Sequence, residues 1–265
     1  MIINFWPEFS ILFAASLVGG VAILPYGLRL LQGSAQKKAL KMSVSQLVLI
    51  SLLQTIIIFA IVTGVGLLAA HAIGLGAPYI EMVLSGNASM QAVVHMLQVA
   101  MIFGAFAGAI LLVADLLFLP YWPKALVDTA RKTTLWENFT ASFYGGINEE
   151  ILVRLLGLSA LAWLLSKIWH TSAGLPTNEV FWAANVIMTI LFGIGHLPSL
   201  KNLIGKISPV MFARSLLLNA PVGLLCGWLF WTYGIEAAIL AHFSADIVYH
   251  VFGTIVLRRN IKSNA

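Results

Sequence analysis

The sequence predicts an all-α fold, a polytopic transmembrane helical bundle of about seven spans. Hydrophobic residues make up 60% of the 265 residues and charged residues only 9%, whereas soluble domains have about 45–50% apolar and about 25% charged residues. The mean hydropathy is +0.94, and the apolar residues gather in long runs. This composition excludes a soluble enzyme and a disordered chain. The single cysteine, Cys226, excludes an intrachain disulfide.

Seven apolar runs are long enough to cross the hydrocarbon core, which takes about 20 residues of helix. They cover residues 9–31, 43–70, 91–120, 139–166, 180–198, 208–232 and 236–257. We expect the first run to be a retained span and not a secretory signal, because residues 1–10 contain Glu8 and no basic residue. All seven should be helical, since a helix satisfies its own backbone hydrogen bonds in lipid.

The basic residues predict the orientation of the chain. Four clusters follow every second span: Arg29, Lys37, Lys38 and Lys41; Lys124, Arg131 and Lys132; Lys201 and Lys206; and Arg258, Arg259 and Lys262. Such clusters favour the cytoplasmic side, so the N-terminus is expected outside and the C-terminus inside. The net charge of +5 therefore indicates topology and not binding to nucleic acid. Residues 121–138 are expected to lie along the inner membrane surface or to form a polar loop.

Span four contains ionisable residues at membrane depth, where charge is costly and points to function. They stand together in one short stretch, which holds Asn148, Glu149, Glu150 and Arg154. Glu150 and Arg154 are four residues apart on one helical face, so we expect them to pair. Glu149 points about 100° away from that face. The spacing therefore predicts a structural role for Glu150 and leaves Glu149 available for chemistry.

Two further spans contain polar residues that should face the bundle interior. Phe192 and His196 share a face near the end of span five, where a lone histidine would be interpreted as a packing residue. Span seven carries a polar stripe formed by His242, Asp246, Tyr249 and His250. Acid, base and hydrogen-bonding groups thus come from three helices, which favours a common site over random scatter.

The depths of these groups differ if the helices are straight. Glu149 lies about 18 Å along its helix from Glu137, whereas His196 lies only about 8 Å from Lys201. We therefore expect the chain around Pro198 to continue inward, or span seven to project past the membrane.

The remaining ionisable residues are interpreted as structural. His71, Glu81 and His170 fall in or near outer loops and should be solvated. Asp115, near the inner end of span three, is expected to pair with a basic residue. Cys226 is expected to be a small packing residue.

Three motifs occur in order within these spans: Glu149-Glu150-x-x-x-Arg154, Phe192-x-x-x-His196 and His242-x-x-x-Asp246. They resemble the signature of the CAAX protease and bacteriocin-processing family (CPBP, or Abi). This is a family of intramembrane endopeptidases related to the type II CAAX prenyl endopeptidase. The resemblance covers about residues 139–253, and spans one to three carry no matching motif.

We accordingly expect one integral-membrane domain, residues 1–265. Its N-terminal part, residues 1–138, would hold spans one to three and the inner-surface segment. Its catalytic core would be residues 139–257, spans four to seven.

The resemblance implies hydrolysis of a peptide bond within the membrane. Glu149 would be the general base that activates water, and His196 would hold and polarise that water. His242 and the residue four later would stabilise the oxyanion. Supporting positions would be taken by Glu150, Arg154, Phe192 and Asn148.

Asp246 stands where the best-known prenyl-peptide processors have Asn. Because an ionised Asp only accepts hydrogen bonds, we expect Asp246 to orient His242.

The chemistry of the site leaves a metal as an alternative. Glu149, His196 and His242 would also suit a zinc ion with one bound water. The usual helical zinc signature of two histidines flanking a glutamate is absent, which favours glutamate-activated water without a cofactor.

The expected partners are the lipid bilayer and a membrane-associated peptide or protein, prenylated or not. The expected location is a prokaryotic cell membrane, crossed several times. Two other functions stay open. One is a non-catalytic bacteriocin-immunity or scaffold protein. The other, less favoured, is a proton-coupled transporter, since buried acids and histidines also build proton relays but inverted repeats are absent.

Overall fold

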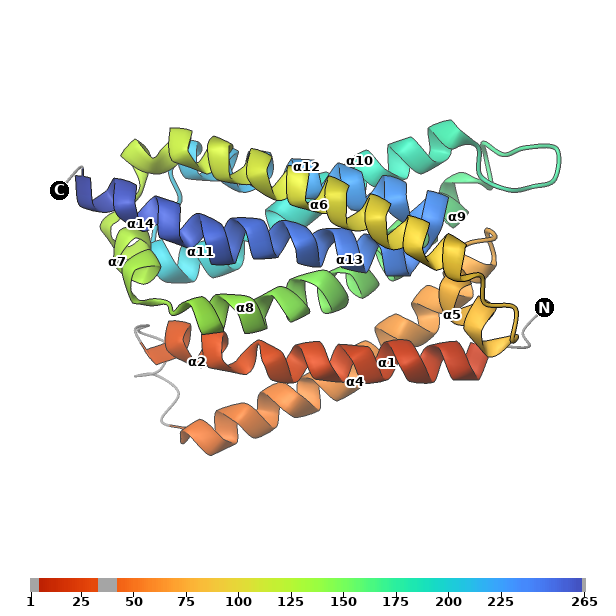
Figure 1. Ribbon diagram of the computed structural model, residues 1–265, viewed down its shortest axis with the longest axis horizontal. Coiled ribbons are helices and arrows are strands. Elements are labelled where there is room, and N and C mark those ends of the chain that lie inside the picture. The colour runs from red at the N-terminus through yellow and green to blue at the C-terminus, as the bar shows by residue number, and fades with distance from the viewer. Residues whose placement is uncertain (1–4, 33–41, 264–265) are drawn as a thin grey trace.

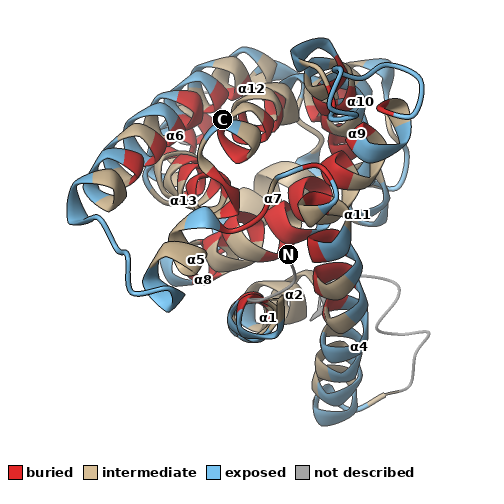
Figure 2. Cartoon of the chain, turned by 90° about the vertical axis from the view of Figure 1, so that its right-hand side faces the viewer, coloured by how far each residue is buried: buried red, intermediate tan, exposed pale blue. Residues whose placement is uncertain are grey.

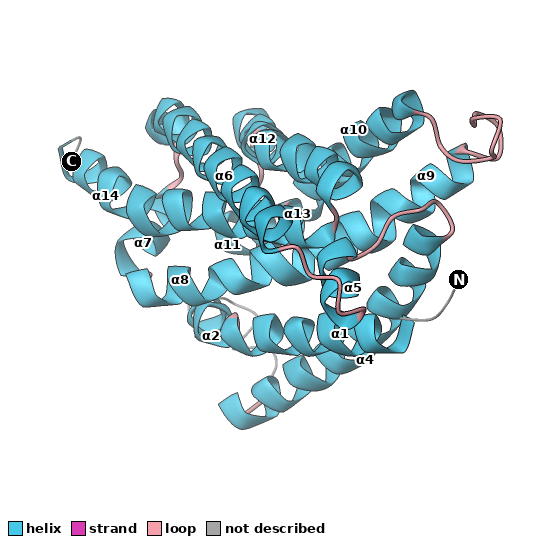
Figure 3. Cartoon of the chain, turned by 45° about the vertical axis from the view of Figure 1, so that its right-hand side comes forward, coloured by secondary structure: helices cyan, strands magenta, loops and turns pink. Residues whose placement is uncertain are grey.

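The computed structural model describes residues 5–32 and 42–263, and its regular secondary structure within these ranges is helical (Figure 3). Six helical runs are long and apolar enough to cross a membrane. They are Phe5–Leu30, Val44–His71, Met90–Tyr121, Asn178–Ile204, Pro209–Tyr233 and Ile235–Ile261. Together with one further helical run they confirm the predicted bundle of about seven spans.

The predicted fourth span is the further run, and it is built differently from the others. Residues 135–165 are helical throughout and comprise α8 (Leu135–Phe143), η2 (Tyr144–Glu149), η3 (Ile151–Leu158) and α9 (Ser159–Leu165). Both η2 and η3 are π-helical. Because π turns are rare and concentrate at functional sites, this run is a candidate location for the functional site.

The other segments have simple helical bounds. The N-terminal part consists of α1 (Phe5–Ala22), α2 (Leu24–Gln32), α4 (Val44–His71), α5 (Pro78–Leu84), α6 (Met90–Phe118), the 3₁₀ turn η1 (Leu119–Tyr121) and α7 (Lys124–Lys132). After α9 follow α10 (Asn178–Gly195), α11 (Leu197–Ile204), α12 (Pro209–Tyr233), α13 (Ile235–Asp246), the π-helical η4 (Ile247–Phe252) and α14 (Gly253–Ser263).

The basic clusters gather at one end of the bundle. Figure 1 shows α2, α7, α11 and α14 together at the end where the C-terminus lies, and the start of α1 with α5 and α9 at the other end. The predicted placement of the clusters on one side is therefore confirmed for the described residues. Lys37, Lys38 and Lys41 lie outside those residues. Which end faces the cytoplasm stays a prediction.

Beyond Pro198 the chain continues as α11, and α10 and α11 together form a single membrane-crossing run. This confirms the expectation that the chain continues inward after His196. His196 therefore lies inside a long helical run and not at its end.

Glycines allow α13 to pack closely against α6. A Cβ atom on Gly104 would lie 2.2 Å from the Ala241 carbonyl oxygen, and one on Gly108 would lie 2.5 Å from the Ala245 carbonyl oxygen. Small residues at helix contacts are the usual way in which membrane helices approach each other. Buried residues line the facing sides of the helices in Figure 2, whereas the outer faces of α4 and α6 are exposed. Many of these exposed side chains are large and apolar, as expected for a surface in contact with lipid.

Candidate active site

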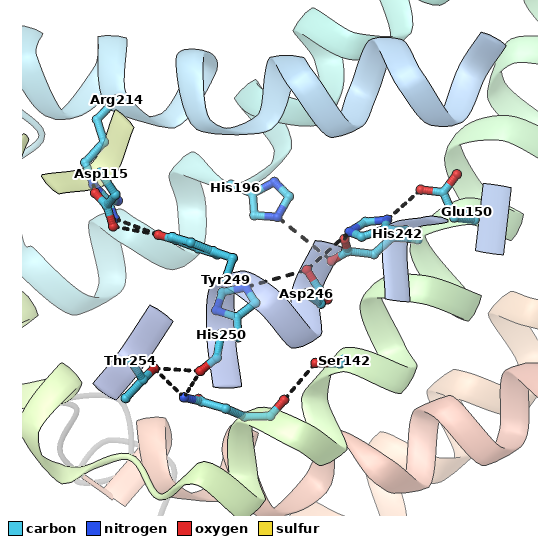
Figure 4. Close-up of polar contacts among 12 residues, drawn as sticks. Asp115, Ser142, Glu150, His196, Arg214, His242, Asp246, Tyr249, His250 and Thr254 are labelled. Carbon is cyan, nitrogen blue, oxygen red and sulfur yellow. Dashed lines mark hydrogen bonds and ion pairs between the residues drawn. The ribbon is translucent and has the colours of Figure 1, made fainter. Parts of the chain in front are cut away.

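The three motifs meet inside the bundle, on the π-helical run, the α10–α11 junction and α13. Figure 4 shows His196, His242, Asp246 and Glu150 around one region between these helices. A π turn adds a residue to the helical turn and shifts the side chains that follow it. Because η2 and η3 are π-helical, the directions of the Glu149 and Glu150 side chains cannot be predicted from the 100° per residue of a regular α-helix.

Glu150 is the structural centre of the site. Its side chain is 0% exposed, and Oε1 accepts a hydrogen bond from Arg154 at 2.9 Å and one from Nδ1 of His242 at 2.6 Å. Arg154 is equally buried and also donates to the Gly223 carbonyl in α12 at 2.8 Å. The predicted Glu150–Arg154 pair is thus confirmed. The pair also connects the π-helical run with α12 and α13.

Glu149 differs from its neighbour, because 25% of its side chain is exposed. Its Oε1 lies 3.9 Å from Nε2 of His196, and its Oε2 lies 3.9 Å from Nε2 of His242. Neither distance is a hydrogen bond, and contacts of this length commonly hold a bridging water. The carboxylate of Glu149 therefore faces two imidazole rings from two other helices.

The hydrogen bonds of both rings define their free nitrogens. Nδ1 of His196 lies 2.8 Å from the Phe192 carbonyl oxygen, and this oxygen can only accept, so Nδ1 donates. In the neutral ring Nε2 is then an acceptor directed at Glu149. Nδ1 of His242 donates to Glu150 in the same way and leaves its Nε2 facing Glu149.

The sequence predicted that Asp246 orients His242, but the ring is oriented by the hydrogen bond that its Nδ1 donates to Glu150. Asp246 Oδ1 lies 3.7 Å from Nε2 of His242 and 3.8 Å from Nε2 of His250, both beyond hydrogen-bond distance. Asp246 is therefore on the same side of the His242 ring as Glu149.

Phe192 packs between the charged groups. The guanidinium carbon of Arg154 lies 5.2 Å from the centre of its ring. The rings of His196 and His242 contact it edge to face at 4.7 Å and 5.9 Å. The aromatic ring thus fixes the two imidazoles by packing and keeps this side of the site apolar.

Asn148 lies away from the site, toward α1. Its side-chain amide donates to the Ser16 carbonyl at 3.0 Å, and its Oδ1 lies 2.0 Å from where a Cβ on Gly19 would be. The residue therefore supports the site indirectly, by fastening the π-helical run to the first span.

Gly145 was not identified from the sequence. A Cβ atom at this position would lie 2.4 Å from Asp246 Oδ2 and 3.4 Å from Nε2 of His242. Only glycine allows η2 to approach α13 this closely. The sequence feature that indicates this close approach is the pair Gly145-Gly146, a few residues before the two glutamates.

Tyr249 and the His250 carbonyl, at the end of the polar stripe in span seven, form hydrogen bonds with residues outside the three motifs. Tyr249 donates to Asp115 at 2.6 Å, and Arg214 donates to both oxygens of Asp115 at 2.6 Å and 2.8 Å. The expected pairing of Asp115 with a basic residue is confirmed. In η4 the His250 carbonyl accepts a hydrogen bond from Asn138 at 2.7 Å, and Figure 4 shows His250 near Thr254.

Two of the weaker interpretations can be compared with the structure. Cys226 is fully buried, as expected for a packing residue. His71 was expected to be solvated, but its ring is partly buried and Nε2 lies 3.0 Å from Oε2 of Glu8. That interpretation was wrong, because α1 packs against the end of α4.

The donors suitable for a metal do not coincide with the set expected from the sequence. Among the described residues of this site, Glu150, Cys226 and His242 place one donor atom each within 4.8 Å of one another. Glu150 already accepts from Arg154 and His242, and Cys226 donates toward the Ala238 carbonyl at 3.6 Å. Glu150 Oε2 has no hydrogen-bond partner among the described residues, whereas Oε1, His242 Nδ1 and the Cys226 thiol already take part in these contacts.

Comparison with known proteins shows a resemblance to one family over part of the chain. No curated protein and no solved structure matches the chain. A family model described as "Type II CAAX prenyl endopeptidase Rce1-like" matches residues 131–248. The matched segment includes all three motifs, so the resemblance inferred from them is confirmed. The match is to a family of proteases, and it lies in a chain whose described residues include six helical runs long and apolar enough to cross a membrane. Residues 131–248 thus resemble the Rce1-like type II CAAX prenyl endopeptidases.

Proposed function

We propose that this protein hydrolyses a peptide bond in a membrane-associated peptide or protein, using a water activated by Glu149. One observation carries the proposal. The partly exposed carboxylate of Glu149 lies 3.9 Å from Nε2 of His196 and 3.9 Å from Nε2 of His242. Two hydrogen bonds of about 2.8 Å, meeting at one water at a right angle, place their partners about 4 Å apart.

In this mechanism the water donates one proton to Glu149 and is held by the acceptor Nε2 of His196. Its oxygen attacks the carbonyl carbon of the substrate as the proton passes to Glu149. The C–O bond forms and the carbonyl oxygen becomes an oxyanion. Glu149 then returns the proton to the amide nitrogen as the C–N bond breaks, which releases the amine product.

His242 is the donor proposed for the oxyanion. With Nδ1 donating to Glu150, the doubly protonated ring carries a second proton on Nε2, directed toward the site. A donor of this kind contributes about 3 kcal/mol to transition-state stabilisation. Asp246 lies 3.7 Å from this nitrogen and keeps the proton-bearing ring next to a negative charge.

We propose that this chemistry needs no metal. A tetrahedral zinc with bonds of about 2.1 Å would hold its donors about 3.4 Å apart. Both contacts of Glu149 with the histidines are longer, and they involve different carboxylate oxygens. Zinc held by Glu149, His196 and His242 is the alternative. It predicts that, well below the melting temperature of the chelated protein, exhaustive chelation abolishes cleavage and zinc restores it in both the wild type and Glu81→Gln, whereas the metal-free mechanism predicts unchanged cleavage there.

The role of Glu149 is tested by Glu149→Gln, which keeps the shape of the side chain and removes the base. We expect the cleavage rate of a reporter peptide to fall by about 10³-fold, within the range for removal of a general base, while the melting temperature stays unchanged. Glu179→Gln, at an exposed carboxylate, is the matched control and should cleave normally. Normal cleavage by Glu149→Gln would reject the proposal.

The same variant distinguishes the other functions. An immunity or scaffold protein would retain its cellular phenotype in the Glu149→Gln variant. A transporter would lose proton-coupled uptake without any peptide product in the wild type.

The substrate class can be narrowed by mass analysis of membrane peptides. Membranes that contain the wild type should hold new peptide termini that are missing with Glu149→Gln. The sequence at those termini will show whether the substrates carry a C-terminal prenylation motif.

A further inference from the structure

A second cluster of metal-ligating side chains lies far along the chain from the active-site motifs, where three helices of the N-terminal part meet. Glu8 comes from α1, His71 is the last residue of α4, and Glu81 comes from α5. One donor atom from each lies within 4.8 Å of the other two. Nε2 of His71 lies 3.0 Å from Oε2 of Glu8 and 3.9 Å from Oε1 of Glu81. Figure 1 shows the start of α1 and α5 at the end of the bundle opposite the basic clusters.

The carboxylate of Glu8 is incompletely satisfied. Its side chain is 1% exposed, and no described residue donates a hydrogen bond to Oε1. A buried carboxylate oxygen without a donor costs free energy, and such a group in a native structure calls for a ligand that satisfies it. The orphaned oxygen belongs to the same carboxylate that contacts His71, so the missing partner would lie within the cluster.

The two carboxylates also require positive charge between them. Glu8 and Glu81 approach within 4.8 Å, and like charges this close destabilise each other unless a cation or a shared proton intervenes. His71 presents a ring nitrogen to both of them. Imidazole nitrogen and carboxylate oxygen are both ligand types that zinc accepts, and water can complete its four-coordinate shell.

The surrounding backbone leaves room for an ion and positions the ligands. Gly76 faces the cluster, because a Cβ atom there would lie 3.2 Å from Nε2 of His71 and 3.7 Å from Oε1 of Glu81. Glu236 accepts hydrogen bonds from the amides of Tyr79 and Ile80 at 2.9 Å each, which fixes the first turn of α5. Glu81 and His71 are partly exposed, so an ion can enter from the surface.

We propose that Glu8, His71 and Glu81 bind a divalent transition-metal cation, for which zinc is the probe. The ion joins α1, α4 and α5. It is separate from the chemistry proposed for Glu149, and its role is to stabilise the packing of the first span. Because α1 also holds the π-helical run through Asn148 and Ser16, the site stabilises the support of the active site as well.

The proposal is tested on the full-length purified protein after chelation and readdition of zinc. We expect one zinc ion per chain by elemental analysis, and a rise in melting temperature of about 5–10 °C at a zinc concentration far above Kd. Glu81→Gln, at a partly exposed position, should fold and should bind zinc at least about 100-fold more weakly. Glu8→Gln should abolish the zinc-dependent rise in melting temperature.

Matched controls separate this site from the active site and from surface binding. His170→Gln and Glu179→Gln change an exposed histidine and an exposed glutamate, and both should retain the bound zinc. Glu149→Gln should also retain the bound zinc. Loss of zinc in Glu149→Gln would instead assign the ion to the active site. Chelated protein that takes up no zinc would overturn the proposal and would indicate a shared proton. Zinc uptake unchanged in both Glu8→Gln and Glu81→Gln would overturn it equally.

Discussion

Glu149 and Glu150 are adjacent in the sequence and differ completely in their surroundings. Glu150 is buried, paired with Arg154 and hydrogen-bonded to His242. Glu149 is partly exposed and only approaches the two histidines. A carboxylate oxygen that already accepts two charge-assisted hydrogen bonds is fixed in position by its two donors. A base must be free to gain and lose a proton, so we propose Glu149, and not Glu150, as the base.

The structural role of Glu150 predicts a loss of stability in Glu150→Gln. The change leaves Arg154 buried without its counter-charge, and breaking a buried pair from one side costs about 3–5 kcal/mol. Cleavage should fall as well, because His242 loses its charged partner. The measurement is the free energy of unfolding in detergent, together with the cleavage rate.

Glu179→Gln serves as the control for Glu150→Gln, since exposed substitutions usually change stability by less than about 0.5 kcal/mol. Equal stability of Glu150→Gln and the wild type would show that the pair does not support the fold.

At the scale of helices, the site depends on irregular turns and close approach. The π turns of η2, η3 and η4 flank the reactive groups, and Gly145 and Gly146 bring η2 against α13. A regular helix would orient Glu149 and Glu150 differently relative to His242. At the site, the helices therefore replace the usual i→i+4 backbone hydrogen bonds with i→i+5 hydrogen bonds.

The close approach of η2 and α13 predicts that Gly145→Ala impairs the site. The added methyl group would lie 2.4 Å from Asp246 Oδ2, so the carboxylate or the helix must move. We expect a loss of about 1–3 kcal/mol of stability and a cleavage rate at least about 10-fold lower, because the rate is sensitive to shifts of about 1 Å.

Gly27→Ala is the matched control for Gly145→Ala, because a Cβ atom at Gly27 in α2 meets nothing within 4 Å. This control should match the wild type or be slightly more stable. Normal cleavage by Gly145→Ala would show that the contact with Asp246 is not needed.

For the whole molecule, the bundle has two chemically different ends. The described members of the basic clusters lie on elements at the C-terminal end in Figure 1, whereas Glu8, His71 and Glu81 come from elements at the end where the chain begins. The positive-inside rule then predicts a cytoplasmic C-terminus and an acidic cluster on the outer side.

The orientation can be measured by labelling single cysteines with a membrane-impermeant maleimide in intact cells. Cys226→Ser provides a cysteine-free background, since Cys226 is the only cysteine. Ser172→Cys, in the loop after α9, should be labelled from outside. Asn202→Cys, at the basic end, should react only after the cells are opened. The reverse pattern would show that the orientation is inverted.

Much of the molecule could be predicted from the sequence because the membrane constrains it strongly. Low charge, the apolar runs and the one-sided basic clusters predicted the bundle and the grouping of its ends. The cost of burying charge made Glu149, Glu150, Arg154, His196, His242 and Asp246 recognisable as a set. The i, i+4 spacing also predicted the pair of Glu150 with Arg154.

Other features followed only from packing between helices. The sequence interpretation assigned the orientation of His242 to Asp246, four residues away on the same helix. In the structure Glu150, 92 residues away, takes that role. Likewise His71 was interpreted as solvated, because nothing local shows that α1 brings Glu8 against it.

The sequence by itself determined which residues are polar inside the bilayer, since the free-energy cost of charge in lipid depends on residue type and position in a span. Only the tertiary structure decided which of these residues are satisfied and which are free to react. That division depends on distances of 3–4 Å between side chains from different helices, and these distances are set by glycine contacts and π turns.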